Sequence, residues 1–235
     1  MVPEKRKKYT HQRISTAIPL LDDMLEGGIP LGLITHIFGA SATGKTTLAI
    51  QCALNSAKKR MKTIYIDTEC GVHPARVLQI AGSKNLLQLQ IIIRPKSFAE
   101  QSNLIDNMES FMVKNVKLIV IDTTTKLYRA ELESLAKNVA LNRELNRQMA
   151  ELLNLASKHN VAVIATNQVS ADTKENGNQI KPAGGSILSY WSSLDLKMEY
   201  LEMGVRRISI IKNLESPERK TINVLLTKKG LHYQQ

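Results

Sequence analysis

Hydrophobic residues follow two alternating patterns along the chain, short apolar runs and longer segments with helical spacing. The short runs contain many β-branched residues and predict strands at residues 33–38, 63–67, 86–93, 117–122 and 161–166. The longer segments carry apolar residues three and four positions apart and predict helices at residues 46–60, 74–81, 99–113 and 132–158. A short amphipathic segment predicts another helix at residues 18–26, which the following glycines end.

This alternation predicts an α/β fold with a mostly parallel sheet flanked by helices. The runs at 117–122 and 161–166 are almost entirely apolar, as strands covered on both faces should be. Three later runs have no helix between them and predict antiparallel strands at the sheet edge, at residues 194–201, 206–212 and 220–226. We expect one core domain at residues 14–235, preceded by a basic tail at residues 1–13.

The longest predicted helix, at residues 132–158, has an apolar stripe that should face the core. Its members recur at three- and four-residue steps and are Leu132, Leu135, Val139, Leu145, Met149, Leu152 and Ala156.

The charge balance narrows the range of partners. The formal net charge is +11 and the pI about 9.6, which favours polyanions such as nucleic acid, although a basic surface can also contact acidic proteins. The 2 cysteines provide neither a disulfide framework nor a zinc cluster. No apolar run reaches the ~18–20 residues of a membrane helix, and no apolar stretch follows the basic N-terminus. We therefore expect an intracellular, cytoplasmic protein.

The stretch from Gly39 to Thr46 matches G-x-x-x-x-G-K-[ST] between a predicted strand and a predicted helix, the context of a phosphate-binding loop. Its N–H groups and the positive end of the helix dipole would bind phosphate oxygens. Lys45 would reach the β- and γ-phosphates, the Thr46 hydroxyl would help to hold Mg²⁺, and Thr47 would bond the α-phosphate. The candidate nucleotide contacts are Gly39, Ala40, Ser41, Ala42, Thr43, Gly44, Lys45, Thr46 and Thr47.

Three polar residues follow predicted strands at the edge where open α/β sheets bind ligands. Asp122 ends the strand at 117–122 and is the candidate second group for Mg²⁺. Glu69 follows the strand at 63–67 and could activate a water molecule, although the nearby Asp67 could be confused with it. Gln168 could sense the γ-phosphate by hydrogen bonding. The alternative for the acids is an ordinary helix or turn cap, and the alternative for Gln168 is a loop residue bonded to the backbone.

Together these motifs resemble the RecA-type recombinase ATPases, in their archaeal and eukaryotic branch. The resemblance rests on GGIPLGLITHIFGASATGKTTLAIQCA, TIYIDTECGVHPARV, KLIVIDTTTKLYRAEL, VAVIATNQV, PAGGSILSYWSS and KNLESPERKTINVLLTKKGL. These stretches cover nearly the whole chain, from residue 15 to about 231. The resemblance implies a RecA-like P-loop NTPase core that binds ATP and Mg²⁺, with Lys45, Glu69 and Gln168 in catalytic roles. Similar proteins act in DNA repair and recombination.

The resemblance also implies roles for residues outside the phosphate-binding loop. Arg76 matches an arginine that packs on adenine, and Lys212 and Pro217 match positions that reach the nucleotide of a neighbouring subunit. Two segments, 124–137 and 170–186, would be the DNA-facing loops. The candidate DNA-binding residues in them are Lys126, Arg129, Lys174 and Lys181.

Departures from the family pattern shape the expected function. The first phenylalanine, Phe38, already lies in the predicted core, so the phenylalanine connector of filament-forming members is expected to be absent. The first DNA-facing loop also contains Glu131 and Glu133. We expect an accessory protein with weak ATPase activity that binds DNA, in single-stranded form, and assists the main RecA-type recombinase. The alternatives are a KaiC-like adaptor or signalling ATPase and an autonomous strand-exchange enzyme, and a homo-oligomer is left open.

Overall fold

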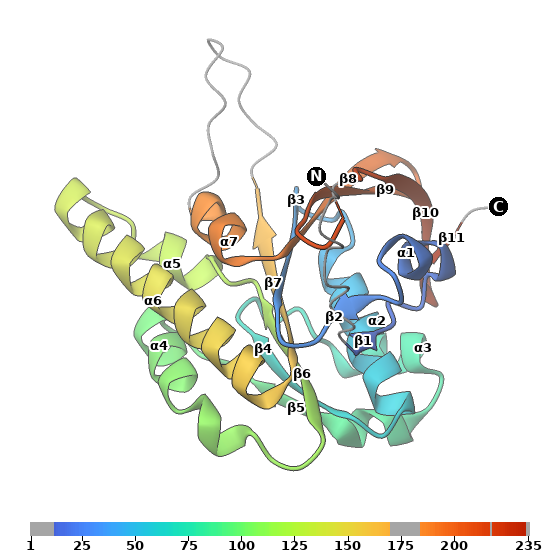
Figure 1. Ribbon diagram of the computed structural model, residues 1–235, viewed down its shortest axis with the longest axis horizontal. Coiled ribbons are helices and arrows are strands. Elements are labelled where there is room, and N and C mark those ends of the chain that lie inside the picture. Colours follow the sequence, from blue (N-terminus) through green and yellow to red (C-terminus); the bar gives the residue numbers. More distant parts are fainter. Residues whose placement is uncertain (1–11, 170–183, 217, 234–235) are drawn as a thin grey trace, which may run out of the picture.

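The computed structural model describes residues 12–169, 184–216 and 218–233 (Figure 1). Its centre is a nine-stranded sheet with the order β11-β10-β9-β8-β3-β7-β6-β4-β5. Six neighbouring strands run parallel: β3 (Ile34–Gly39), β4 (Lys62–Asp67), β5 (Gln90–Ile93), β6 (Val116–Asp122), β7 (Ala162–Gln168) and β8 (Leu194–Glu202). The antiparallel strands β9 (Val205–Asn213), β10 (Thr221–Thr227) and β11 (Gly230–Tyr233) extend the sheet beyond β8. The predicted fold class is confirmed.

Helices cover both faces of the parallel part of the sheet (Figure 1). One face packs against α1 (Pro19–Met24), α2 (Lys45–Lys58) and α3 (Pro74–Ala81). The other packs against α4 (Phe98–Asp106), α5 (Lys126–Ala130), α6 (Leu135–His159) and α7 (Gly185–Trp191). Strand β6 shows why its sequence is continuously apolar, since Leu118 and Val120 enter one core while Ile119 and Ile121 enter the other.

Some elements were not expected from the sequence. A small antiparallel sheet joins β1 (Arg13–Ile14) to β2 (Ile29–Pro30), so Arg13, which the sequence assigned to the tail, belongs to the folded part. Helices α5 and α7 and strand β11 were also missed, because each is too short to show a periodic pattern. No helix of the described part of the chain is long and apolar enough to cross a membrane.

Two predicted elements were too long. The predicted strand at residues 86–93 is a 3₁₀ helix at Lys84–Leu89 followed by β5 alone, because Ser83 caps that turn and accepts a hydrogen bond from Asn85 N. The predicted helix at residues 99–113 ends as α4 at Asp106 and continues as a short 3₁₀ helix, Met108–Phe111.

The buried stripe of α6 also differs from the predicted one. Leu145, Met149, Leu152 and Ala156 are buried as expected, but Val139 is 48% exposed. Leu132 precedes the helix, because α6 begins only at residue 135. The first turns of α6 therefore extend beyond the core, and apolar spacing alone could not show where the core ends.

Candidate functional site: a nucleotide cleft

The candidate site forms where β3 turns into α2 at the carboxyl edge of the parallel strands. The turn needs left-handed backbone at two positions, with φ of 60° at Ala42 and 99° at Gly44. A Cβ at residue 39 would lie 2.1 Å from Met198 O, so only glycine fits beside strand β8. Gly39 and Gly44 of the motif therefore have a physical reason to be glycines.

Lys45 lies in the first turn of α2 and is folded against the loop that it follows. Its Nζ donates hydrogen bonds to Gly39 O at 3.0 Å and Ala40 O at 2.7 Å. Burial lowers the pKa of the Lys45 ammonium, and the carboxylates of Asp122 and Glu69 oppose this effect. Within the described residues this buried cation has carbonyl oxygens as its hydrogen-bond acceptors, and it is well placed to exchange them for phosphate oxygens.

Asp122 ends β6 and is held firmly within the site. Tyr65 Oη donates to Asp122 Oδ2 at 2.9 Å, and Thr166 Oγ1 donates to Asp122 Oδ1 at 2.5 Å. Burial raises the pKa of Asp122, and hydrogen bonds from Thr166, Thr46 and Tyr65 counteract this rise. The Thr46 hydroxyl and the Asp122 carboxylate thus lie together, and oxygen ligands of this kind suit Mg²⁺.

The structure separates the roles of Asp67 and Glu69. The Asp67 carboxylate accepts hydrogen bonds from Gly71 N and Arg94 Nε, so it stabilises the turn after β4. Glu69 lies in the cleft instead, where its Oε1 accepts a hydrogen bond from Thr123 Oγ1 at 3.0 Å. Of the two acids, Glu69 is therefore the one that can act on a bound ligand.

The cleft has a volume of about 310 Å³ and brings the end of the phosphate-binding loop together with Glu69 and Gln168. Its lining consists of Ser41, Ala42, Gly44, Lys45, Thr46, Thr47, Glu69, Thr123, Gln168, Arg206 and Leu226. Hydroxyl and ammonium groups beside carboxylates suit a polyphosphate that carries a divalent cation. The residues present therefore fit ATP and Mg²⁺.

Gln168 connects the cleft to helix α5. Gln168 ends β7 and lines the cleft. Its backbone carbonyl oxygen accepts a hydrogen bond from Arg129 Nη1 at 3.2 Å. Lys126 is exposed at the first position of α5, in a segment where the sequence suggested a loop. A single turn of helix thus joins two of the candidate DNA contacts to the candidate γ-phosphate sensor.

Two residues assigned from the resemblance lie outside the cleft lining. Arg76 donates hydrogen bonds to Thr227 O and Lys228 O in the turn between β10 and β11. Lys212 donates to Ser189 O and Ser192 O at the end of α7, both at 2.6 Å. Both side chains thus donate their hydrogen bonds to backbone carbonyl oxygens of the same chain. The other assigned residues, Pro217, Lys174 and Lys181, lie outside the described residues.

Three residues of the cleft lining were not predicted from the sequence: Thr123, Arg206 and Leu226. Thr123 directly follows Asp122, so its position beside the acid was a usable signal. Arg206 comes from β9, far along the chain, and nothing in the local pattern distinguished it from its neighbour Arg207.

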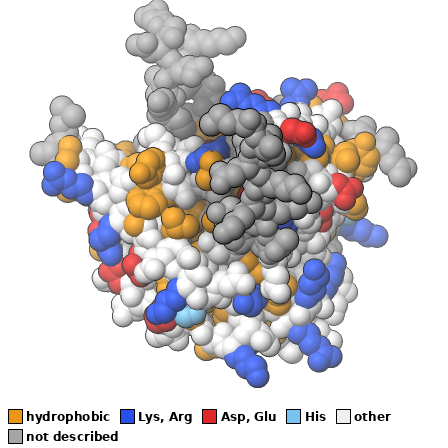
Figure 2. Space-filling model, in the orientation of Figure 1, with side chains coloured by type: hydrophobic (Ala, Val, Ile, Leu, Met, Phe, Trp, Pro, Cys, Tyr) orange, Lys and Arg blue, Asp and Glu red, His pale blue; other side chains and the backbone are white. Residues whose placement is uncertain are grey.

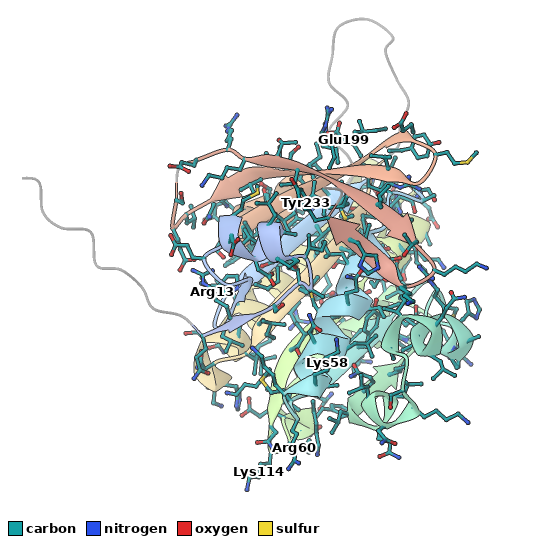
Figure 3. The ribbon with its side chains drawn as sticks, turned by 90° about the vertical axis from the view of Figure 1, so that its right-hand side faces the viewer. Arg13, Lys58, Arg60, Lys114, Glu199 and Tyr233 are labelled. Carbon is teal, nitrogen blue, oxygen red and sulfur yellow. The ribbon has the colours of Figure 1, made fainter. Side chains whose placement is uncertain are left out.

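Positive charge alone does not locate a DNA surface. In Figure 2 Lys and Arg side chains are scattered around the rim of the molecule. Figure 3 shows Lys58, Arg60 and Lys114 toward the lower end of the molecule. Arg60 precedes β4 and Lys114 precedes β6, so they lie near the amino ends of parallel strands, opposite the cleft. Positive residues therefore occur both near the cleft and at the opposite edge, and their distance from the cleft distinguishes the candidate DNA contacts from the other cations.

The fold and the cleft define a RecA-like P-loop NTPase. The chain belongs to the Rad51 family, whose model matches residues 5–233. A "DNA repair and recombination protein RadB" from Methanococcoides burtonii is 37% identical over 227 residues, covering 96% of this chain and 99% of the relative. A protein of the same name from Thermococcus sibiricus is 35% identical over 223 residues, covering 93% and 94%.

A solved structure supports the same conclusion. The crystal structure of the RadB recombinase aligns with a TM-score of 0.80 and 32% sequence identity, over 94% of this chain and 100% of that one. The resemblance to archaeal and eukaryotic recombinases, with RadB proteins among the similar relatives, is thereby confirmed.

Proposed function

We propose that this protein is an ATP-binding DNA repair and recombination accessory protein that binds DNA and assists the main RecA-type recombinase. The supporting observation is that Lys45 and Glu69 line one cleft, with the buried Asp122 hydrogen-bonded to Thr46 of its lining, in a chain similar over almost its whole length to RadB proteins. This role places the protein with DNA in the cytoplasm.

Different residues of the site would contact different parts of the nucleotide and its metal ion. The amides of the loop from Gly39 to Gly44, with Lys45 and Thr47, would bind the phosphate groups. Thr46 and Asp122 would hold Mg²⁺, which neutralises charge on the β- and γ-phosphates. Glu69, positioned by Thr123, would orient the attacking water, and Gln168 would report the γ-phosphate.

The DNA-binding part of the proposal rests on α5. Lys126 and Arg129 lie on this helix, and Arg129 is bonded to the backbone of Gln168. A change at the γ-phosphate can therefore reach a DNA-facing helix through one hydrogen bond. Lys174 and Lys181, outside the described residues, complete the proposed contacts.

The ATPase activity is proposed to be weak. Arg76 and Lys212, which family members use around the nucleotide, are held by carbonyl groups of this chain and do not line the cleft. Because the resemblance gives Lys212 a role at the nucleotide of a neighbouring subunit, a monomer would lack that contribution, and a homo-oligomer or a complex with the recombinase would complete the site.

One experiment tests the role directly. DNA strand exchange by the main recombinase is measured with this protein, with its Lys45→Ala variant and without it, and complexes are sized by light scattering with ATP and single-stranded DNA. We expect a complex and faster exchange with the unchanged protein only. Binding to neither DNA nor the recombinase would favour an adaptor that acts through other proteins, and strand exchange by this protein alone would show an autonomous enzyme.

A further inference from the structure

Arg206 is a nearly buried arginine with no carboxylate partner among the described residues. It is 7% exposed, although arginines so deeply buried are normally paired with an acid or another anion. Its hydrogen bonds go to carbonyl oxygens instead. Nε donates to Ala42 O at 3.2 Å, and Nη1 donates to Val205 O at 2.9 Å and Glu202 O at 3.4 Å. The guanidinium is thus largely buried, and no carboxylate of the described residues forms an ion pair with it.

The surroundings hold the guanidinium in a fixed place beside the phosphate-binding loop. Arg206 lines the same cleft as Lys45 and Thr46. Its guanidinium carbon lies 4.6 Å from the ring centroid of Tyr200, the residue opposite it on β8. Nη2 has no hydrogen-bond partner within the described residues, so it still has two N–H groups to donate.

A purely structural role is the main alternative. In that case Arg206 would only fasten the hairpin of β8 and β9 to the loop at Ala42, and the Tyr200 ring would stabilise the cation. Carbonyl dipoles and a ring face do not neutralise a full charge, however, and they leave Nη2 unused. An anion in the cleft would account for both observations.

We propose that Arg206 binds phosphate oxygens of the nucleotide from within its own chain. This inference rests on the proposed function, since it assumes that the cleft binds ATP. Arg206 then supplies a second cation beside Lys45 without help from a neighbouring subunit. Because the same guanidinium holds Ala42 O, nucleotide binding is also communicated to the β8–β9 hairpin.

The test compares ligands that differ only in their phosphates. Binding of ATP, ADP and adenosine is measured by calorimetry for the unchanged protein, Arg206→Met and Arg206→Lys. Methionine keeps an apolar stem without the charge, so we expect affinity for ATP and ADP to fall roughly 10- to 100-fold, as for a lost charged hydrogen bond, with adenosine unaffected. Lysine keeps the charge but cannot bond both Ala42 O and a phosphate, so the loss should be several-fold smaller.

The adjacent arginine provides a matched control. Arg207 points to the other side of β9, opposite Glu199, and does not line the cleft. Arg207→Met should bind all three ligands as the unchanged protein does. Thermal unfolding without ligand shows whether each variant folds, and if Arg206→Met does not, Arg206→Lys still carries the test.

The outcomes separate this inference from the proposed function. Equal weakening of ATP, ADP and adenosine would mean that Arg206 only supports the loop, and it would overturn the inference. So would unchanged ATP binding by a folded Arg206→Met variant. If the unchanged protein itself failed to bind ATP, the proposed function would fail first.

Discussion

Thr123 Oγ1 donates a hydrogen bond to Glu69 Oε1 over 3.0 Å, and it thereby joins the segments that follow the neighbouring strands β6 and β4 in the lining of the nucleotide cleft. Thr123 is also fixed by Thr68, whose hydroxyl accepts from Thr123 N at 2.9 Å and donates to Thr123 O at 2.8 Å. The acid that would orient water is thus held by a residue adjacent to Asp122.

Thr123→Val should therefore slow ATP hydrolysis without changing ATP affinity. Removing the hydroxyl leaves Glu69 free to turn away, and we expect kcat to fall about tenfold, part of what a positioned general base supplies. Single-turnover hydrolysis and calorimetric binding of ATP check the two halves of the prediction. Weaker ATP binding with unchanged kcat would show that Thr123 serves binding instead.

Buried hydroxyl groups without partners offer a stability test. Thr63 Oγ1 on β4 is buried and has no hydrogen-bond partner in the part of the chain that the structure describes, whereas Thr166 Oγ1 donates to Asp122. Thr63→Val should raise the free energy of unfolding by about 1 kcal/mol, because a desolvated polar group is removed. The same substitution at Thr166 should not stabilise the protein. Urea unfolding of both variants decides the matter, and a destabilised Thr63→Val variant would contradict the prediction.

Whether an element could be predicted from the sequence depended on the length of its hydrophobic or motif pattern. The strand at β6 and the loop from Gly39 to Thr46 were recognisable because one is continuously apolar and the other has fixed spacing. Helix α5 and strand β11 were not, since a turn of helix or four residues of strand carry too little periodicity.

The candidate site was predictable to a similar extent. Asp122 and Glu69 follow strands, so parallel topology alone brings them to one edge. The position of Arg206 could not be predicted from strand order. It lies on the antiparallel strand β9, and it reaches the site through a hydrogen bond to Ala42 O, a residue far from it in the sequence. The roles of Arg76 and Lys212 came from resemblance alone, and their partners here are carbonyl groups of the same chain.

The proposed DNA contacts can be compared with cations at the opposite edge. The double variant Lys126→Glu, Arg129→Glu should weaken binding of single-stranded DNA and reduce the slope of log K against log salt by about 0.7 for each lost phosphate contact. The matched variant Arg60→Glu, Lys114→Glu makes the same change in charge away from α5 and should have a much smaller effect. Fluorescence anisotropy at several salt concentrations measures both. Equal losses would mean that binding follows net charge and not the position of α5.

The contact between α4 and α6 predicts a specific acid sensitivity. Hydrogen bonds from Arg147, and lesser ones from Ser102 and Gln148, lower the pKa of Glu144 to about 2 from its ordinary 4.5. Because the pKa is lower in the folded state, this stabilisation is complete above about pH 4.5 and is lost as the pH falls toward 2. Screening by solvent limits it to roughly 1 kcal/mol.

Glu144→Gln should therefore be less stable at neutral pH, while the difference from the unchanged protein shrinks below about pH 4. Denaturant unfolding between pH 7 and pH 3 measures this difference. A constant difference over that range would show that the ionised form of Glu144 contributes nothing to stability.

The loop ending at Lys45 is proposed to bind the phosphates of ATP together with Mg²⁺. Calorimetric titration of Mg-ATP into the unchanged protein and into Lys45→Ala measures this binding. We expect one site per chain in the unchanged protein and an affinity lower by roughly 10- to 100-fold in the variant, as for a lost charged hydrogen bond. Equal affinities for the two proteins, or no heat of binding with either, would contradict it.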